Sequence, residues 1–294
     1  MKESAQPAPV SRRRIWNEFR SNRVAVGSIC FLAVLAVIAL VFVLFGKTGV
    51  NWPYDPSSPV LEQKLLPPGP GHWLGTDNLG RDVLTRLLHG SYISLTIGFI
   101  AVGVSMTIGV TVGAIAGYWR GWIDGVLMRI VDAIMCFPTF FLILTVVAIL
   151  GPSIWNIIIV IGLVSWTGTA RLVRAEFLSL RENQYVYAAR ALGQSHLRLM
   201  FRHILPNAMA PILVTAVLGI PDAILTEAGL SFLGFGVQPP KPTWGNIIAD
   251  GKTYFLEAWW LILFPGLAIL VTTLAFYLAG DGLREATDIR KTGK

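Results

Sequence analysis

The chain has 294 residues, of which 54% are hydrophobic and 14% charged, with 24 Lys and Arg against 17 Asp and Glu. Soluble domains carry about 25% charged residues, so this composition excludes a typical soluble enzyme. The chain also contains long runs without any charged residue. Each run exceeds the roughly 20 helical residues that cross a bilayer, so the sequence predicts an all-α polytopic membrane protein. These runs cover residues 24–46, 87–119, 133–170 and 258–280.

Six membrane-spanning helices are predicted along the chain. As a single helix the run 133–170 is nearly twice as long as the membrane is thick, so we expect it to turn back once at the Gly-Pro-Ser sequence 151–153. A fifth crossing is expected between residues 203 and 240, where Asp222 and Glu227 are the only charged residues. The predicted spans are residues 24–45, 92–118, 130–150, 154–170, 209–234 and 258–280.

Basic residues are distributed unequally between the two sides that these spans define. One side holds 18 of the 24 Lys and Arg residues, so the positive-inside rule places both termini in the cytoplasm and explains the basic surplus without nucleic-acid binding. The first apolar run is too long for a signal peptide and is expected to remain as an anchor. The predicted organisation is a cytoplasmic tail (1–23), a first span (24–45), an outer loop (46–90), a five-helix domain (91–281) with a cytoplasmic segment (171–206), and a second tail (282–294).

The outer loop contains Asp82 and Arg86 one helical turn apart. An ion pair at this spacing stabilises a helix by a few tenths of a kcal/mol. We expect such a pair to steady a short helix in an otherwise solvated loop.

Three glycines in the second span, Gly109, Gly113 and Gly117, recur every four residues and share one helical face. Small residues let a second helix approach the backbone closely. We therefore expect a packing seam, formed either with another helix of this chain or with a second membrane subunit.

The fifth span contains Pro221, Asp222 and Glu227. An ionised side chain in the membrane is costly unless it is paired or faces water, and a proline leaves the carbonyl four residues earlier without its helical donor. Two interpretations stay open: a distorted stretch that lines a transport path, or carboxylates held in structural hydrogen bonds. If Glu227 lies on the path, Glu227→Gln should impair uptake without unfolding the chain.

The cytoplasmic segment after the fourth span is predicted to form two short helices. Residues 185–192 are a helical run rich in small residues, and Gly193 suits the left-handed position that ends a helix. Ser195 is placed to cap the next helix, 196–203, and Pro206 is expected to end it. Exposed alanines let a partner close around the backbone, so the segment is either a docking site or an amphipathic helix at the lipid headgroups.

This segment also matches a known motif. Its matching residues are Tyr187, Ala188, Ala189, Gly193, Leu205 and Pro206. In spacing they resemble the EAA loop of ATP-binding-cassette importer permeases, with Tyr187 at the Glu position and His203 at the Ile position. Further segments are similar to the C-type permeases of oligopeptide and dipeptide importers. They are residues 74–77, 80–82, 230–234, 238–240, 244–245 and 280–284.

The resemblance implies a type I importer permease fold with six transmembrane helices in a bacterial inner membrane. It implies that the motif residues contact two cytoplasmic ATPases, which hold the ATP and Mg²⁺, and that a homologous second permease completes the path. A substrate-binding protein is expected to dock outside, on loops 46–90 and 235–257. The chain itself is expected to be no enzyme and to bind no cofactor or metal. Peptides are the favoured cargo, although relatives in the family carry nickel chelates, glutathione or oligosaccharides.

Other functions have weaker support. The tripeptides 46–48 and 251–253 read Gly-Lys-Thr like the end of a phosphate-binding loop, but each lacks the first glycine of that motif. An ion-gradient-driven carrier would use Asp222 and Glu227, but inverted internal repeats are not evident.

A membrane enzyme would depend on the four histidines, which show no metal-ligand spacing. These are His72, His89, His196 and His203. We expect them to be surface or interfacial residues.

Overall fold

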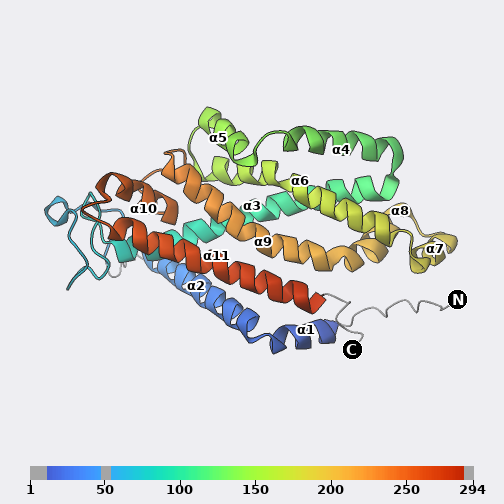
Figure 1. Ribbon diagram of the computed structural model, residues 1–294, viewed down its shortest axis with the longest axis horizontal. Coiled ribbons are helices and arrows are strands. Elements are labelled where there is room, and N and C mark those ends of the chain that lie inside the picture. The colour runs from blue at the N-terminus through green and yellow to red at the C-terminus, as the bar shows by residue number, and fades with distance from the viewer. Residues whose placement is uncertain (1–11, 48–53, 288–294) are drawn as a thin grey trace.

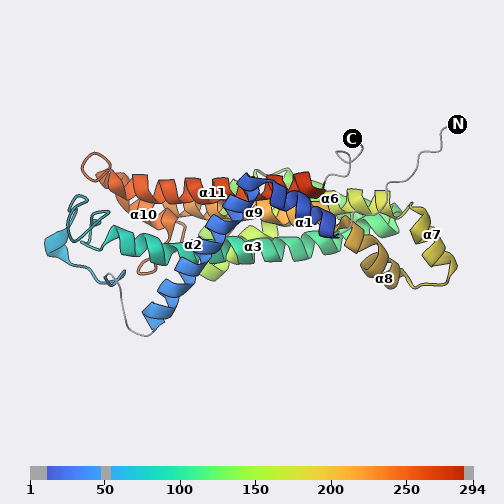
Figure 2. The same cartoon turned by 90° about the horizontal axis from the view of Figure 1, so that it is seen from below.

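The computed structural model describes residues 12–47 and 54–287, and within these ranges it contains helices and no β-strand. The remaining residues of the two predicted tails and of the outer loop lie outside the described residues. Five helices are long and apolar enough to cross a membrane, and they run along the long axis of the molecule except for the first of them, which is inclined to it (Figures 1 and 2). They are α2 (Arg23–Lys47), α3 (Val83–Trp119), α6 (Ile154–Leu180), α9 (Leu205–Phe232) and α11 (Trp260–Thr287).

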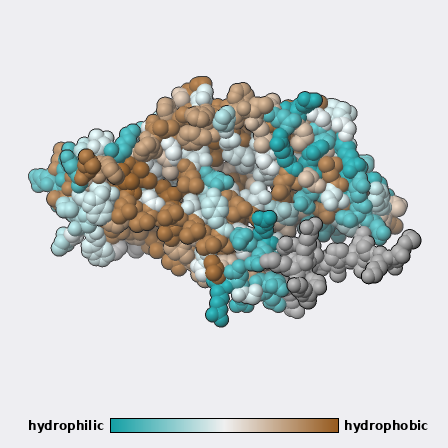
Figure 3. Space-filling view, in the orientation of Figure 1, coloured by the Kyte–Doolittle hydropathy of each residue, from teal (hydrophilic) through white to brown (hydrophobic). Residues whose placement is uncertain are grey.

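Shorter helices lie at the two ends and on one side of this bundle. They are α1 (Arg12–Ser21), α4 (Gly121–Met135), α5 (Thr139–Leu150), α7 (Gln184–Ala191), α8 (His196–Arg198) and α10 (Trp244–Gly251). The helices α7 and α8 form one end, toward which α1 and the last turns of α11 also point (Figures 1 and 2). The outer loop and α10 form the opposite end. Hydrophobic residues gather between these two more hydrophilic ends (Figure 3).

The third predicted span is not a continuous helix. Residues 130–150 are divided between α4 and α5, which are bent by 81° at the break between them. Pro138 lies at this break; it has no N–H to donate, and its ring would clash with the carbonyl four residues earlier if the helix continued. The structure therefore has six spans only if the bent pair α4 and α5 counts as one.

Several helices are longer than predicted. The helix α3 begins at Val83 rather than at residue 92, because the Asp82 side chain accepts a hydrogen bond from the Thr85 N–H at 2.7 Å and caps the helix. The helix α6 continues to Leu180, ten residues beyond the predicted end at 170. Hydrophobicity marks the membrane-embedded part of a helix, and these extensions carry polar residues outside it.

The predicted helix end at Pro206 is wrong. Helix α8, the π-helical segment η2 (Leu199–Ile204) and α9 follow one another without interruption. Pro206 follows directly on η2, where the helix has the wider π hydrogen-bond pattern, so the missing proline N–H falls where the i→i−4 pattern is already interrupted. The end of the molecule that carries α7 and α8 is thus joined directly to a membrane-spanning helix.

The main core lies between α3, α6 and α9, with α2, α5 and α11 packed around it. Its buried side chains include Ile97, Ile157, Ile161 and Ile224. The three glycines on α3 lie against α6, where an added Cβ would come within 2.6 Å of Thr169 at Gly109, 2.5 Å of the Ala170 carbonyl at Gly113, and 2.6 Å of Phe177 at Gly117. Glycine is required there because the two backbones approach so closely.

Candidate functional site

The turn between α7 and α8 has a geometry that depends on Gly193. Its φ is +75°, a left-handed conformation that glycine adopts without strain. The Gly193 N–H donates to the Arg190 carbonyl at 3.0 Å, and the Gln194 N–H donates to the Ala189 carbonyl at 3.3 Å. This pair of bonds is a Schellman motif, which ends α7 and reverses the chain. Ser195 holds the N-cap position of α8, although its side chain makes no capping hydrogen bond.

A second hydrophobic cluster anchors α7 to the bundle. Val186 and Ala189 are buried against Leu199, Met200 and Ile204 of η2, and the cluster continues into the ends of α3 and α6. Ala189 is therefore an internal packing residue and not part of the exposed face that was predicted for both alanines. Ala188 is exposed.

Polar contacts tie the same segment to α3. The His196 ring lies 2.7 Å from the Tyr118 hydroxyl, and Arg181 donates to the Tyr118 carbonyl at 2.5 Å. His203, which stands at the Ile position of the motif, lies 2.7 Å from the Gln194 side chain across the turn. Both histidines thus hold the turn in place. Their spacing in the sequence argued against a metal site but did not indicate this role.

The outward side of the segment is an exposed apolar patch. It consists of Tyr187, Ala188, Leu192, Leu197 and Phe201. Leu192 is 82% exposed, and the guanidinium of Arg190 lies over the Tyr187 ring at 5.8 Å. Ala188 and Leu192 are four residues apart, as are Leu197 and Phe201, so each pair shares a helical face, and exposed apolar side chains grouped in this way mark an interaction surface. Of the other motif residues, Leu205 is half-buried and Pro206 is exposed at the start of α9.

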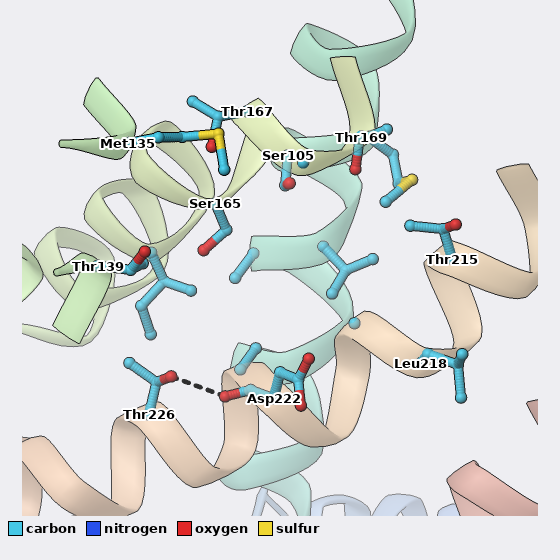
Figure 4. A pocket seen from close by; sticks show the side chains of 17 residues that line it. Ser105, Met135, Thr139, Ser165, Thr167, Thr169, Thr215, Leu218, Asp222 and Thr226 are labelled. Carbon is cyan, nitrogen blue, oxygen red and sulfur yellow. Dashed lines mark hydrogen bonds between the residues drawn. The ribbon is translucent and has the colours of Figure 1, made fainter. Parts of the chain in front are cut away.

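A cavity of about 450 Å³ lies between α3, α5, α6 and α9 (Figure 4). Its lining is rich in hydroxyl side chains, which are Ser105, Thr139, Ser165, Thr167, Thr169, Thr215 and Thr226. Asp222 also lines it, whereas Pro221 and Glu227 are not among its lining residues. The three path candidates from the sequence are therefore separated: one faces the cavity and two do not.

Glu227 is buried and connects α9 to the start of α10. One of its carboxylate oxygens, Oε1, accepts hydrogen bonds from Ser231 at 2.7 Å and from Thr243 at 3.0 Å. Thr243 in turn caps α10 through a capping box with Asn246. This geometry favours the structural interpretation of Glu227.

Glu227→Gln is therefore expected to leave uptake near the wild-type rate, because the amide keeps an oxygen that accepts both hydroxyls. Glu227→Ala leaves both hydroxyls without that acceptor and should lower the free energy of unfolding by about 1–3 kcal/mol. Unfolding by SDS titration and uptake are measured on both variants. Loss of uptake in a stable Glu227→Gln protein would instead place this residue on the path.

The outer end contains a buried ionic cluster that the sequence did not indicate. Asp77 accepts from Arg81 Nε at 2.7 Å and from Arg86, and both arginines also contact Asp250 of α10, at 3.2 and 2.9 Å. Asp77, Arg81 and Arg86 are all nearly inaccessible to solvent. The cluster joins the outer loop to α3 and α10.

The predicted ion pair between Asp82 and Arg86 is wrong. The expectation that these residues lie in a solvated loop is also wrong, because both are buried. Asp82 caps α3 and lies 2.9 Å from the ring of His72, which is buried and also lies 3.1 Å from Gln63. Arg86 instead reaches Asp77. Helical spacing alone suggested the pair, but the cap and the folded loop give both side chains better partners.

Two family models match this chain, one over its N-terminal part and one over most of the five-helix domain. Residues 109–292 match the model of the family described as binding-protein-dependent transport system inner membrane component, and residues 12–68 match the N-terminal TM domain of oligopeptide transport permease C. The chain is 40% identical over 276 residues to the dipeptide transport system permease protein DppC of Alkalihalophilus pseudofirmus, which covers 94% of this chain and 89% of that protein.

Two further comparisons bear on cargo and fold. The glutathione transport system permease protein GsiD of Pectobacterium atrosepticum is 41% identical over 278 residues, covering 94% of this chain and 90% of that protein. A solved inward-facing structure of the MetNI methionine ABC transporter matches with a TM-score of 0.57 at 18% identity, covering 69% of this chain and 97% of that chain. At this identity the structural match concerns the fold alone.

Proposed function

The chain belongs to the family of binding-protein-dependent transport system inner membrane components, and from this premise we propose that it forms half of the membrane path of an ATP-driven peptide importer. It is a transport subunit and not itself an enzyme. A homologous permease supplies the other half. The relatives named for dipeptide and glutathione transport support a peptide cargo.

One observation carries the proposal: the exposed apolar patch on α7 and α8 is held rigidly on the end of a membrane-spanning helix. The buried contacts of Val186 and Ala189 fix α7 on η2, and η2 continues into α9, which lines the cavity. Force applied to the patch is thereby transmitted to the wall of the cavity. Nucleotide binding by a partner changes the cavity only if it stabilises one of two arrangements of these helices more than the other.

The distribution of basic residues supports the assignment of sides. The α7 end, toward which both described chain ends point, carries most of the Lys and Arg residues, so it is the cytoplasmic end in an inner membrane. One of the two ATPases, which hold ATP and Mg²⁺, docks there at Tyr187, Ala188 and Gly193, and the other docks on the homologous permease. The opposite end, with the outer loop fixed to α10, receives the substrate-binding protein.

Gly193 variants test this coupling in the assembled transporter. A Cβ at Gly193 would meet no other part of this chain within 4 Å, so a larger side chain acts either through strain at its own positive φ or through a clash with the partner. Gly193→Leu is expected to lower uptake about tenfold or more while the ATPases still hydrolyse ATP, since leucine both resists a positive φ and adds bulk. Uptake and hydrolysis are measured together in proteoliposomes.

Gly193→Asn is the matched control, because asparagine tolerates the left-handed conformation better than other residues with a Cβ. If Gly193→Asn couples uptake to hydrolysis better than Gly193→Leu does, the effect of leucine comes mainly from the backbone conformation. If both variants are equally uncoupled, the effect comes mainly from close contact with the ATPase. Full coupling of transport to hydrolysis in Gly193→Leu would contradict the docking assignment.

A further inference from the structure

Asp222 places a carboxylate inside the cavity at membrane depth. It lies within α9, and its side chain is exposed there (Figure 4). Carboxylates within membrane spans are costly, and when present they pair with a cation or serve a transport path. The contacts that Asp222 makes therefore decide what it is suited to bind.

Those contacts leave the charge of Asp222 unneutralised. The Tyr277 hydroxyl donates to Oδ1 at 2.8 Å. No Lys, Arg or His lies within ion-pair distance of Asp222 in the described part of the chain, and none is among the lining residues of the cavity. The carboxylate thus has one neutral donor and room for a cationic one.

The neighbouring hydroxyls on α9 are oriented as acceptors. Thr226 donates its hydroxyl proton to the Asp222 main-chain carbonyl at 2.7 Å, and Thr215 donates to the Pro211 carbonyl at 2.9 Å. A hydroxyl that has donated its only proton presents only lone pairs to a ligand. Because Thr215, Asp222 and Thr226 are spaced by seven and four residues, they share one face of the helix. This face offers negative charge and acceptors, which is the complement of a group with several N–H donors.

Building on the proposed function, we infer that Asp222 receives the protonated amino terminus of a peptide during its passage. An ammonium group has a positive charge and three N–H donors, so it can bind the carboxylate and the hydroxyl oxygens together. The cavity wall of this chain offers no cation for the peptide carboxylate. The peptide therefore crosses with its amino end, and not its carboxyl end, against α9.

Substitutions in the complete transporter test the charge requirement. Asp222→Asn is expected to reduce uptake of a tripeptide by about tenfold or more, which corresponds to the loss of one hydrogen bond to a charged group. Asp222→Glu keeps the charge and should retain most of the uptake. Tyr277→Phe removes the neutral donor but keeps the charge, so it should change uptake less than Asp222→Asn does. The affinity of the separate binding protein for the tripeptide is the control and should not change, because that protein carries none of the substitutions. Equal uptake by wild type and Asp222→Asn would overturn the inference.

A second measurement reports orientation directly. Two tripeptides carry photoactivatable leucine at the first or at the last position, and labelled segments of this chain are identified by mass spectrometry during turnover. The first-position probe should label residues 218–226 several times more than the last-position probe, and Asp222→Asn should abolish this difference. Equal labelling from both positions would overturn the inference about Asp222 alone. Uptake without labelling of this cavity from either position would contradict the proposed path itself.

Discussion

Asp77→Asn is expected to cost about 3–5 kcal/mol of the free energy of unfolding, because it leaves two buried arginines without their shared carboxylate. Asp77 and Arg86 are inaccessible to solvent, and Arg81 is nearly so. Asp250 alone would then face both guanidinium groups, and its side chain is partly exposed. Arg81 and Arg86 still contact Asp250, so we expect the outer loop to loosen around residues 77–81 while it stays attached to α10. SDS titration of the purified permease measures the loss.

Glu182→Gln is the matched control for Asp77→Asn. Glu182 also accepts from an arginine, Arg120, at 2.8 Å, but the two side chains are 51% and 45% exposed and lie outside the predicted spans. Exposed ion pairs contribute about 0–1 kcal/mol, so the control should unfold almost as wild type does. Equal destabilisation by the two substitutions would show that burial does not govern the effect of the cluster.

Gly113→Leu is expected to separate α3 from α6 and to cost about 3 kcal/mol, at the upper end of typical overpacking. Its Cβ alone would lie 2.5 Å from the Ala170 carbonyl and 2.8 Å from Val173, and Val173 is buried in the second hydrophobic cluster, so the helices cannot separate without disrupting that cluster. Unfolding by SDS and the yield of assembled transporter are the measurements.

Gly103→Leu on the same helix is the control for Gly113→Leu, because a Cβ at Gly103 would meet nothing within 4 Å. Leucine favours a helix more than glycine does, so this variant should be as stable as wild type or slightly more stable. Similar losses at both positions would contradict the account, because the close approach of α6 exists only at Gly113.

Much of the fold can be predicted from the lengths of the apolar segments in the sequence. Residues 24–45 lie within α2, and the predicted span 258–280 corresponds to α11 from Trp260 onward, because a bilayer demands long apolar helices whatever their neighbours are. The break at Pro138 was missed because the spans were drawn from the lengths of uncharged runs, and a proline does not interrupt such a run. The helical ends were missed because caps such as Asp82 act beyond the apolar part.

The site is only partly predictable because its polar partners are distant in sequence. Gly193 and the helix before it follow from local rules of helix termination. The contacts of His196 with Tyr118 and of Asp77 with Arg86 depend on the folded arrangement, so no local spacing indicates them. Asp222 and Glu227, equivalent in sequence, differ because one faces the cavity and the other faces Thr243.

The most direct test of the central claim is uptake by proteoliposomes that contain both permeases, with the ATPases and ATP either present inside or omitted. The account predicts uptake of a binding-protein-delivered tripeptide only when the ATPases and ATP are present, and none under an imposed proton or sodium gradient. Gradient-driven uptake by the permeases alone would contradict it.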